Sequence, residues 1–265
     1  MTFSEAQFNA AIEKINGGMG TLSQKMGEIR PAAAAGLNHF YIPDFVKDAV
    51  MYLVDKVVAA AQWLWDKFVE LLKGIAAPVL FFKYAFDWQD VKHSASNVAG
   101  QAKPEVLRAG LQWTGPAATS YGKIIGPQGN AAGKLGTIAD KLSVALGLCA
   151  AAGLAFYVAL GFIIAQFVIA FVGVVAALGS VAFSWAGVAL AAGQTTISAG
   201  LVTAAVTTLV AVLGVQAQQM AAIRGEAVDN GFFPGPPVGH WPDPSTGQYS
   251  DGTVKDGDAD WSLNK

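Results

Sequence analysis

The chain has 265 residues, a net charge of −2 and a single cysteine. Its composition, 53% hydrophobic and 14% charged, is more apolar than that of a typical soluble globular protein. The charge provides no basic surface for nucleic acid, and one cysteine cannot form an intrachain disulfide. Charged residues interrupt the first 25 positions, so we expect no classical signal peptide.

The N-terminal segment predicts a helix with one apolar seam. Ser4 fits the N-cap of a capping box. The seam residues recur at alternating spacings of four and three, which is a heptad pattern that we expect to face a partner helix. They are Phe8, Ile12, Ile15, Met19, Leu22, Met26 and Ile29. Glycines within the seam indicate a kink or a close approach, and we expect Pro31 and Gly36 to break the chain.

A second amphipathic helix is expected from Asp44, its N-cap, to about Gly74. Its apolar stripe fits core packing, and its Trp63 and Trp65 beside lysines also fit a helix on a membrane surface. Residues 92–104 are rich in Ser, Asn, Gly and Ala and predict a loop. Pro104 suits the first turn of a helix that reaches about Gln112.

A tight turn is predicted at Trp113-Thr-Gly115-Pro116, leading into a helix that carries Tyr121. Gly126-Pro127 is expected to break that helix. A further helix should begin near Asn130 and enter the apolar part of the chain.

Residues 142–223 contain no Asp, Glu, Lys, Arg or His over 82 positions. As one helix they would extend on the order of 120 Å, whereas a bilayer core needs about 20 residues for each pass. We therefore expect two antiparallel helices, with breaks at Gly179-Ser180 and Gly193-Gln194. The alternative is a soluble assembly in which neighbouring subunits cover the apolar surface. The membrane or assembly residues expected here are Leu154, Phe162, Phe167, Phe171, Val175, Trp185, Leu201 and Val210.

The tail after Glu226 is rich in Pro, Gly, Asp and Ser, and we expect it to be extended or disordered. The predicted fold is therefore all-α. It has an N-terminal helical bundle over residues 1–141 with a Trp-x-Gly turn, a hydrophobic helical hairpin over 142–223, and an acidic tail over 224–265.

No pattern predicts catalysis. The segment from Gly126 to Leu135 is superficially like a phosphate loop, but only three residues separate Gly129 from Gly133, and Leu135 replaces the required hydroxyl. The histidines and Cys149 lack metal-ligand spacing. We expect no enzyme activity, no metal and no cofactor.

The residues Trp113-Thr-Gly115-Pro116-Ala-Ala-x-x-Tyr121 resemble the WxG-type substrates of the mycobacterial ESX (type VII) secretion systems. The turn is similar to that of the PPE proteins, and the overall plan is similar to Esp proteins of the EspA and EspE kind. The resemblance implies that Trp113, Gly115 and Tyr121 carry export recognition. The family's companion Tyr-x-x-x-Asp/Glu signal is absent from this chain, so a small helical partner is expected to supply it, and that partner could occupy the Phe8–Ile29 seam.

The leading expectation is a non-enzymatic type VII secretion substrate of the cell envelope or cell surface, recognised by the secretion machinery. It would form a homo-oligomer, either as a membrane pore or as a surface filament, and would contact a lipid bilayer. The alternatives are a pore-forming toxin domain and a resident integral membrane protein. In the last of these, Trp113 is only a packing residue.

Overall fold

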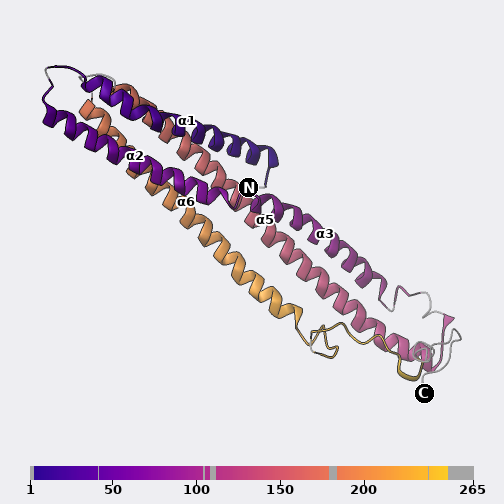
Figure 1. The fold of residues 1–265 in the computed structure, drawn as a ribbon. Coiled ribbons are helices and arrows are strands. Elements are labelled where there is room, and N and C mark those ends of the chain that lie inside the picture. Colours follow the sequence, from indigo (N-terminus) through magenta and orange to yellow (C-terminus); the bar gives the residue numbers. More distant parts are fainter. Residues whose placement is uncertain are drawn as a thin grey trace, which may run out of the picture. The chain divides into compact units, whose positions relative to one another are not determined.

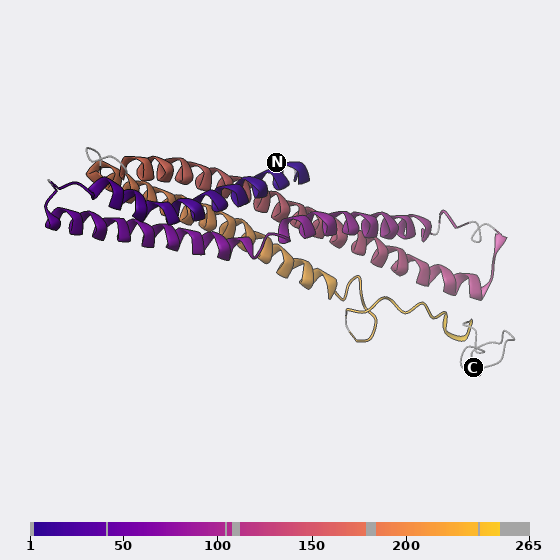
Figure 2. The same cartoon turned by 45° about the horizontal axis from the view of Figure 1, so that its top comes forward.

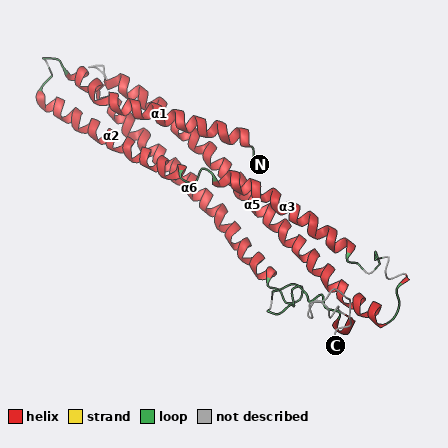
Figure 3. Ribbon diagram, turned by 45° about the vertical axis from the view of Figure 1, so that its right-hand side comes forward, coloured by secondary structure: helices red, strands yellow, loops and turns green. Residues whose placement is uncertain are grey.

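A computed structural model shows that the long elements of the chain are α-helices (Figures 1 and 3). It describes residues 3–40, 42–103, 105–107, 112–178, 184–237 and 239–249, except for the side chains of 184–192, 194, 195 and 248. The helices are α1 (Glu5–Leu37), α2 (Asp44–Leu72), α3 (Ala77–Gln101), α5 (Pro116–Leu178), α6 (Ser184–Ala227) and a short 3₁₀ turn (Gly247–Tyr249). The described residues include no β-strand, so the all-α prediction is confirmed.

The chain forms two compact units, each built from two separate stretches. The first, called here the bundle unit, combines Met1–Phe81 with Cys149–Gly214. The second, the tail unit, combines Phe82–Leu148 with Val215–Lys265. Helices α3, α5 and α6 each contribute to both units. The units therefore do not follow the three consecutive segments expected from composition.

Helix α1 begins as predicted, because the Ser4 hydroxyl accepts a hydrogen bond from the Gln7 amide at 3.4 Å. Of its seam, Phe8, Ile15, Met19, Leu22 and Ile29 are buried, and Ile12 and Met26 are half-buried. The Phe8 ring meets the Tyr157 ring of α5 edge-on, with centroids 5.5 Å apart. The seam thus faces helices of its own chain in place of the separate partner helix that its pattern suggested (Figure 2).

The prediction that Pro31 breaks this helix is wrong, since α1 continues past it to Leu37, whereas the end of the helix one residue after Gly36 agrees with the break predicted there. A proline inside a helix removes one backbone hydrogen bond and costs about 3 kcal/mol. The residues around it include Ile29, Ala33 and Leu37, which are buried on the same face. Burial of this last turn offsets the local cost of Pro31.

Helix α2 supplies the second wall of the bundle unit. Asp44 is its first helical residue and not its N-cap, which is Pro43 and makes no side-chain cap bond. The helix ends at Leu72, close to the predicted Gly74. Its buried residues are Val50, Val54, Val57, Ala61, Leu64 and Phe68, so the apolar stripe packs in the core.

In the tail unit the predicted loop at 92–104 is wrong, because α3 remains helical to Gln101. Small residues allow α3 and α5 to approach closely. A Cβ at Gly129 would lie 3.2 Å from the Ala102 carbonyl oxygen, and one at Gly136 would lie 3.3 Å from the Ser96 hydroxyl. This packing outweighs the weak helix propensity of Ser, Asn and Gly in α3.

The predicted break at Gly126-Pro127 is also wrong, and the packing of α5 against α3 explains why. Helix α5 runs through both residues without a break. Just after the proline, α5 packs closely against α3 at Gly129, Gly133 and Gly136. This packing stabilises the helical conformation of α5 at Pro127. Of the helix predicted from Pro104 to Gln112, Pro104 and 108–111 lie outside the described residues, and 105–107 are not helical.

The predicted hairpin forms in the bundle unit, where α5 and α6 run antiparallel (Figures 1 and 2). Helix α5 ends at Leu178 and α6 begins at Ser184, in agreement with the break predicted at Gly179-Ser180, although 179–183 lie outside the described residues. The second predicted break, at Gly193-Gln194, is wrong because α6 continues through it. Ala191 and Ala192 precede this pair and favour a helix, and one glycine costs a helix only about 1 kcal/mol, so α6 continues.

The tail is more ordered than its composition predicted, up to Tyr249. Phe233 is buried beside Ala131, Ile138 and Ile223. The Gln128 amide donates to the Pro242 carbonyl oxygen at 2.8 Å, and the Trp241 indole N–H donates to the Gln128 side-chain oxygen. Two aromatic anchors therefore hold this part of the tail on α5. Residues 250–265 lie outside the described part of the chain.

The close approach of α1 to α5 yields a direct test. A Cβ at Gly18 would lie 2.9 Å from Cγ1 of Ile164, whereas one at Gly20 would meet nothing within 4 Å. Gly20→Ala should raise the free energy of unfolding by up to about 1 kcal/mol through helix propensity. Gly18→Ala should lower it by roughly 1–3 kcal/mol through overpacking. Urea unfolding of both variants measures the difference, and equal effects at the two positions would contradict the packing described.

Candidate functional site

The outer face of the hairpin is the most distinctive surface of the bundle unit. Two helices are long and apolar enough to cross a membrane: α5 over Pro116–Leu178 and α6 over Thr196–Ala227, with mean hydropathies of 2.7 and 2.0 in their most apolar windows. Only 39% of the first window and 11% of the second are buried. The length and composition of these two helices are compatible with association with a membrane.

The eight predicted membrane or assembly residues divide between two faces. Leu154, Phe167 and Phe171 are buried and Val175 is half-buried, whereas Phe162, Leu201 and Val210 are exposed. The Trp185 side chain lies outside the described residues. The hairpin thus has one face that packs in the bundle and another that is bare.

On α5 the bare face carries an apolar stripe, beside which the Gln166 side chain is also exposed. Val158, Phe162, Ile169 and Val172 are all exposed, Ile169 by 74%, and their spacings of three, four and seven place them on one side of the helix. Ile197, Leu201 and Val210 are exposed on α6. Leu201 and Val210 are nine residues apart and so lie on opposite sides of α6, which exposes apolar side chains around its circumference. Isolated exposed apolar residues are common in proteins, but apolar residues exposed repeatedly along two adjacent helices mark an interaction surface.

Three threonine hydroxyls of α6 are satisfied within the helix. The hydroxyls of Thr203, Thr207 and Thr208 each donate to the carbonyl oxygen four residues earlier, at 2.9 Å. In lipid an unsatisfied polar group costs several kcal/mol. These hydroxyls therefore add little cost to burying α6 in an apolar environment.

The Trp-x-Gly turn has the geometry that its sequence predicted. Gly115 has a φ of +109°, which favours glycine, and α5 begins at the next residue, Pro116. The Trp113 and Tyr121 rings lie 5.6 Å apart at 49°, so the structure brings the three predicted export residues together. Trp113 remains 44% exposed and borders a cavity of about 360 Å³.

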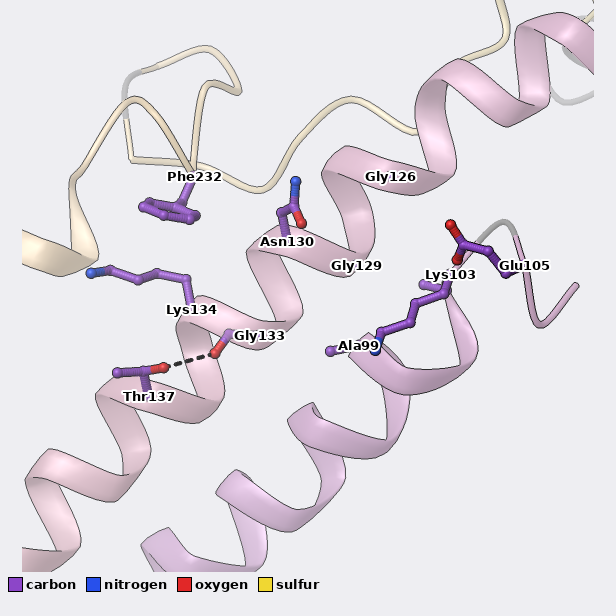
Figure 4. Close-up of a pocket in the computed structure, with 11 residues that line it drawn as sticks. Ala99, Lys103, Glu105, Gly126, Gly129, Asn130, Gly133, Lys134, Thr137 and Phe232 are labelled. Carbon is purple, nitrogen blue, oxygen red and sulfur yellow. Dashed lines mark hydrogen bonds between the residues drawn. The ribbon is translucent and has the colours of Figure 1, made fainter.

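The segment that looks superficially like a phosphate loop lies within helix α5, where it borders a groove of about 800 Å³ (Figure 4). A phosphate loop presents free backbone N–H groups, whereas helical N–H groups are bonded to the preceding turn. Lys134 is also engaged, because its ammonium lies 2.8 Å from Glu226 and over the Phe232 ring at 5.1 Å. The helical segment therefore does not offer the free backbone N–H groups with which a phosphate loop binds a nucleotide.

Glu226 holds the open end of the hairpin in the tail unit, a role that the sequence analysis missed. Its carboxylate accepts from Lys134 at 2.8 Å and also from Lys141. Hydrogen bonds from these two ammonium groups lower the pKa of Glu226 below its ordinary value. The available signal was the placement of Lys134, Lys141 and Glu226 at the two boundaries of the uncharged segment, where charges can pair across a hairpin.

No metal-binding group of three His, Cys, Asp or Glu residues occurs in the described part of the chain. No family model matches the chain, and no curated protein or solved structure matches it either. The candidate surface and the Trp113 turn are therefore argued from their own geometry.

The Glu226 contacts predict a pH dependence. Because the folded chain lowers the pKa of this carboxyl group, the two ion pairs stabilise the fold above the ordinary value of 4.5, and this contribution is lost as the pH falls through the lowered folded value. Between pH 6 and pH 3 the melting temperature of the wild type should therefore fall more than that of Glu226→Gln. Thermal unfolding followed by circular dichroism measures this, and parallel curves would show that the ion pairs contribute nothing.

Proposed function

We propose that the chain is a non-enzymatic protein of the cell envelope whose α5–α6 hairpin enters a lipid bilayer. The observation that carries this proposal is the exposed apolar surface of both helices of a hairpin without charged residues over 142–223. A soluble protein would bury this surface, and lipid would cover it at the cost of few polar side chains, with Gln166 of α5 among them. Self-association of the inserted hairpins into a homo-oligomer would build either a pore or a surface filament.

The arrangement of the bundle unit supports the proposed insertion into a bilayer. Helices α1 and α2 cover only the inner face of the hairpin, with Gly18 of α1 against Ile164 and Ala11 against Gly161. Their own outer faces carry charged residues, including the Arg30–Asp55 ion pair at 2.8 Å. The chain thus combines a water-compatible side with a lipid-compatible side.

A charge on the bare stripe tests the proposal. Ile169→Asp changes a side chain that is 74% exposed, so the fold should be retained. A carboxylate at the bilayer centre costs about 3 kcal/mol, which lowers the partition coefficient into lipid roughly 100-fold. Flotation with vesicles of anionic and zwitterionic lipid measures this partition. Val106→Asp, at a position that is 58% exposed and outside the hairpin, is the matched control. If the wild type fails to float with any vesicle, or if both variants float equally well, the proposal is wrong.

We also propose that Trp113, Gly115 and Tyr121 form an export signal read by a type VII secretion system. The contact of the Trp113 and Tyr121 rings beside an open cavity supports this second role. Such recognition would deliver the chain to the cell envelope without a signal peptide. A small helical partner with the Tyr-x-x-x-Asp/Glu signal would then bind beside the turn, because the α1 seam is already covered within the chain.

Replacing Trp113 by Ala should abolish export. Loss of the ring contact with Tyr121 should cost about 0.5–1.5 kcal/mol, so the chain should remain folded. Trp63→Ala is a matched control, because Trp63 is exposed by 45% and Trp113 by 44%. The measurement is the amount of each variant in the culture medium and cell envelope of a host with an active type VII system. Normal export of Trp113→Ala would exclude the recognition role.

A further inference from the structure

A cavity of about 370 Å³ lies inside the bundle unit, where α2 ends and α3 begins against the hairpin. Six apolar side chains dominate its walls: Leu71, Ala77, Phe81, Phe156, Leu209 and Leu213. They come from all four helices that meet at this place. The volume falls within the range of small-molecule sites and exceeds the roughly 150 Å³ of an engineered apolar cavity that binds benzene.

Two contacts fix the α2–α3 turn to α5 on one side of this cavity. Pro78 at the start of α3 sits directly on Gly153 of α5, where a Cβ would come within 2.5 Å of the proline ring. The Tyr157 hydroxyl donates to the Leu71 carbonyl oxygen at 3.1 Å. Both ends of the α2–α3 turn are therefore fixed to α5, and the space between this turn and α6 stays open.

The cavity offers almost no polar group to an occupant. The Tyr157 hydroxyl is engaged with Leu71, and the Glu70 carboxylate accepts from Lys67 at 2.8 Å. The Cys149 thiol is a weak donor. The groups that line this space therefore offer few partners to a polar ligand, whereas an apolar ligand would cover its carbon surface.

We propose that this cavity binds the acyl chain of a membrane lipid. The apolar lining and the lack of unpaired polar groups require an apolar occupant, and two of its walls belong to α5 and α6, the hairpin that would lie in the bilayer. The choice of a lipid as the source of the chain rests on the proposed membrane function. The acyl chain would fill the gap between the α2–α3 turn and α6 and would hold the bundle to the surrounding lipid.

Cys149 provides a specific reporter, because it is the only cysteine and lines the cavity. The probe is decanoic acid below its micellar concentration, with butyric acid as the short-chain control. The reaction of Cys149 with methyl methanethiosulfonate, a small uncharged reagent, should slow roughly tenfold at about ten times the Kd of decanoic acid, as mass action requires. Butyric acid should leave the rate nearly unchanged.

Ala77→Phe fills the cavity, and Ala76→Phe places the same ring at an exposed neighbouring position that does not line it. Decanoic acid should protect Cys149 in the wild type and in Ala76→Phe but not in Ala77→Phe. The proposal is overturned if decanoic acid protects no form of the chain, or if it protects Ala77→Phe as well as Ala76→Phe. Circular dichroism confirms that both variants are folded.

Vesicle flotation of the same variants separates this proposal from the membrane function. If Ala77→Phe floats but decanoic acid never protects Cys149, the cavity proposal fails and the membrane function stands. If decanoic acid protects Cys149 but no form of the chain floats, the cavity binds acyl chains and its assignment to a membrane lipid is wrong.

Discussion

The absence of charge from residues 142–223 is the constraint on which the rest of the structure depends. A backbone without polar side chains beside it must satisfy its N–H and C=O groups internally, so the segment forms helices and folds back on itself. In the bundle unit α1 and α2 shield one side of the resulting hairpin through buried aliphatic and aromatic residues. In the tail unit the helical ends are held by Glu226 with two lysines and by the buried Phe233.

The covered face of the hairpin stabilises the fold in water, whereas the bare face does not. Burial of Leu154, Phe167 and Phe171 against the bundle is stabilising in water at about 25 cal/mol per Å² of apolar surface. The bare stripe through Phe162 and Ile169 gains nothing from the fold and is stabilised only by lipid or by another apolar surface. The proposed insertion therefore does not require the bundle to open, because the face that would meet lipid is already outside.

The parts of the fold that could be predicted from the sequence are those with long and regular patterns. The heptad from Phe8 to Ile29, the Ser4 cap and the uncharged hairpin each depend on periodicity or length, which are local properties. The predictions at Pro31, at 92–104 and at Gly126-Pro127 failed for one reason. Helix propensity disfavours single glycines, prolines and serines, but contacts between residues distant in sequence kept all three segments helical. The match between Ala102 and Gly129 can be seen only when the register of α3 and α5 is known.

The candidate site was also only partly predictable. The sequence indicated which residues were apolar enough for lipid, but not that Phe167 would be buried while Phe162 was bare, because that division depends on which face α1 and α2 cover. The contact between Trp113 and Tyr121 was not predicted, although the turn at Gly115 and the helix that carries Tyr121 were. The Glu226 ion pairs had a signal in the charges at the two boundaries of the uncharged segment, whereas the cavity at the α2–α3 turn arises from tertiary packing alone.

The most direct test of the central claim is to measure whether the exposed surface of the hairpin contacts lipid or water when vesicles are present. A nitroxide spin label at Leu201→Cys, in a Cys149→Ser background, reports collisions with oxygen, which concentrates in the bilayer, and with a water-soluble nickel complex. On addition of vesicles the account predicts that oxygen collisions rise and nickel collisions fall at position 201, with no change for the same label at Val106→Cys. If the label at position 201 remains fully accessible to nickel with every lipid composition, the hairpin does not enter the bilayer and the account is wrong.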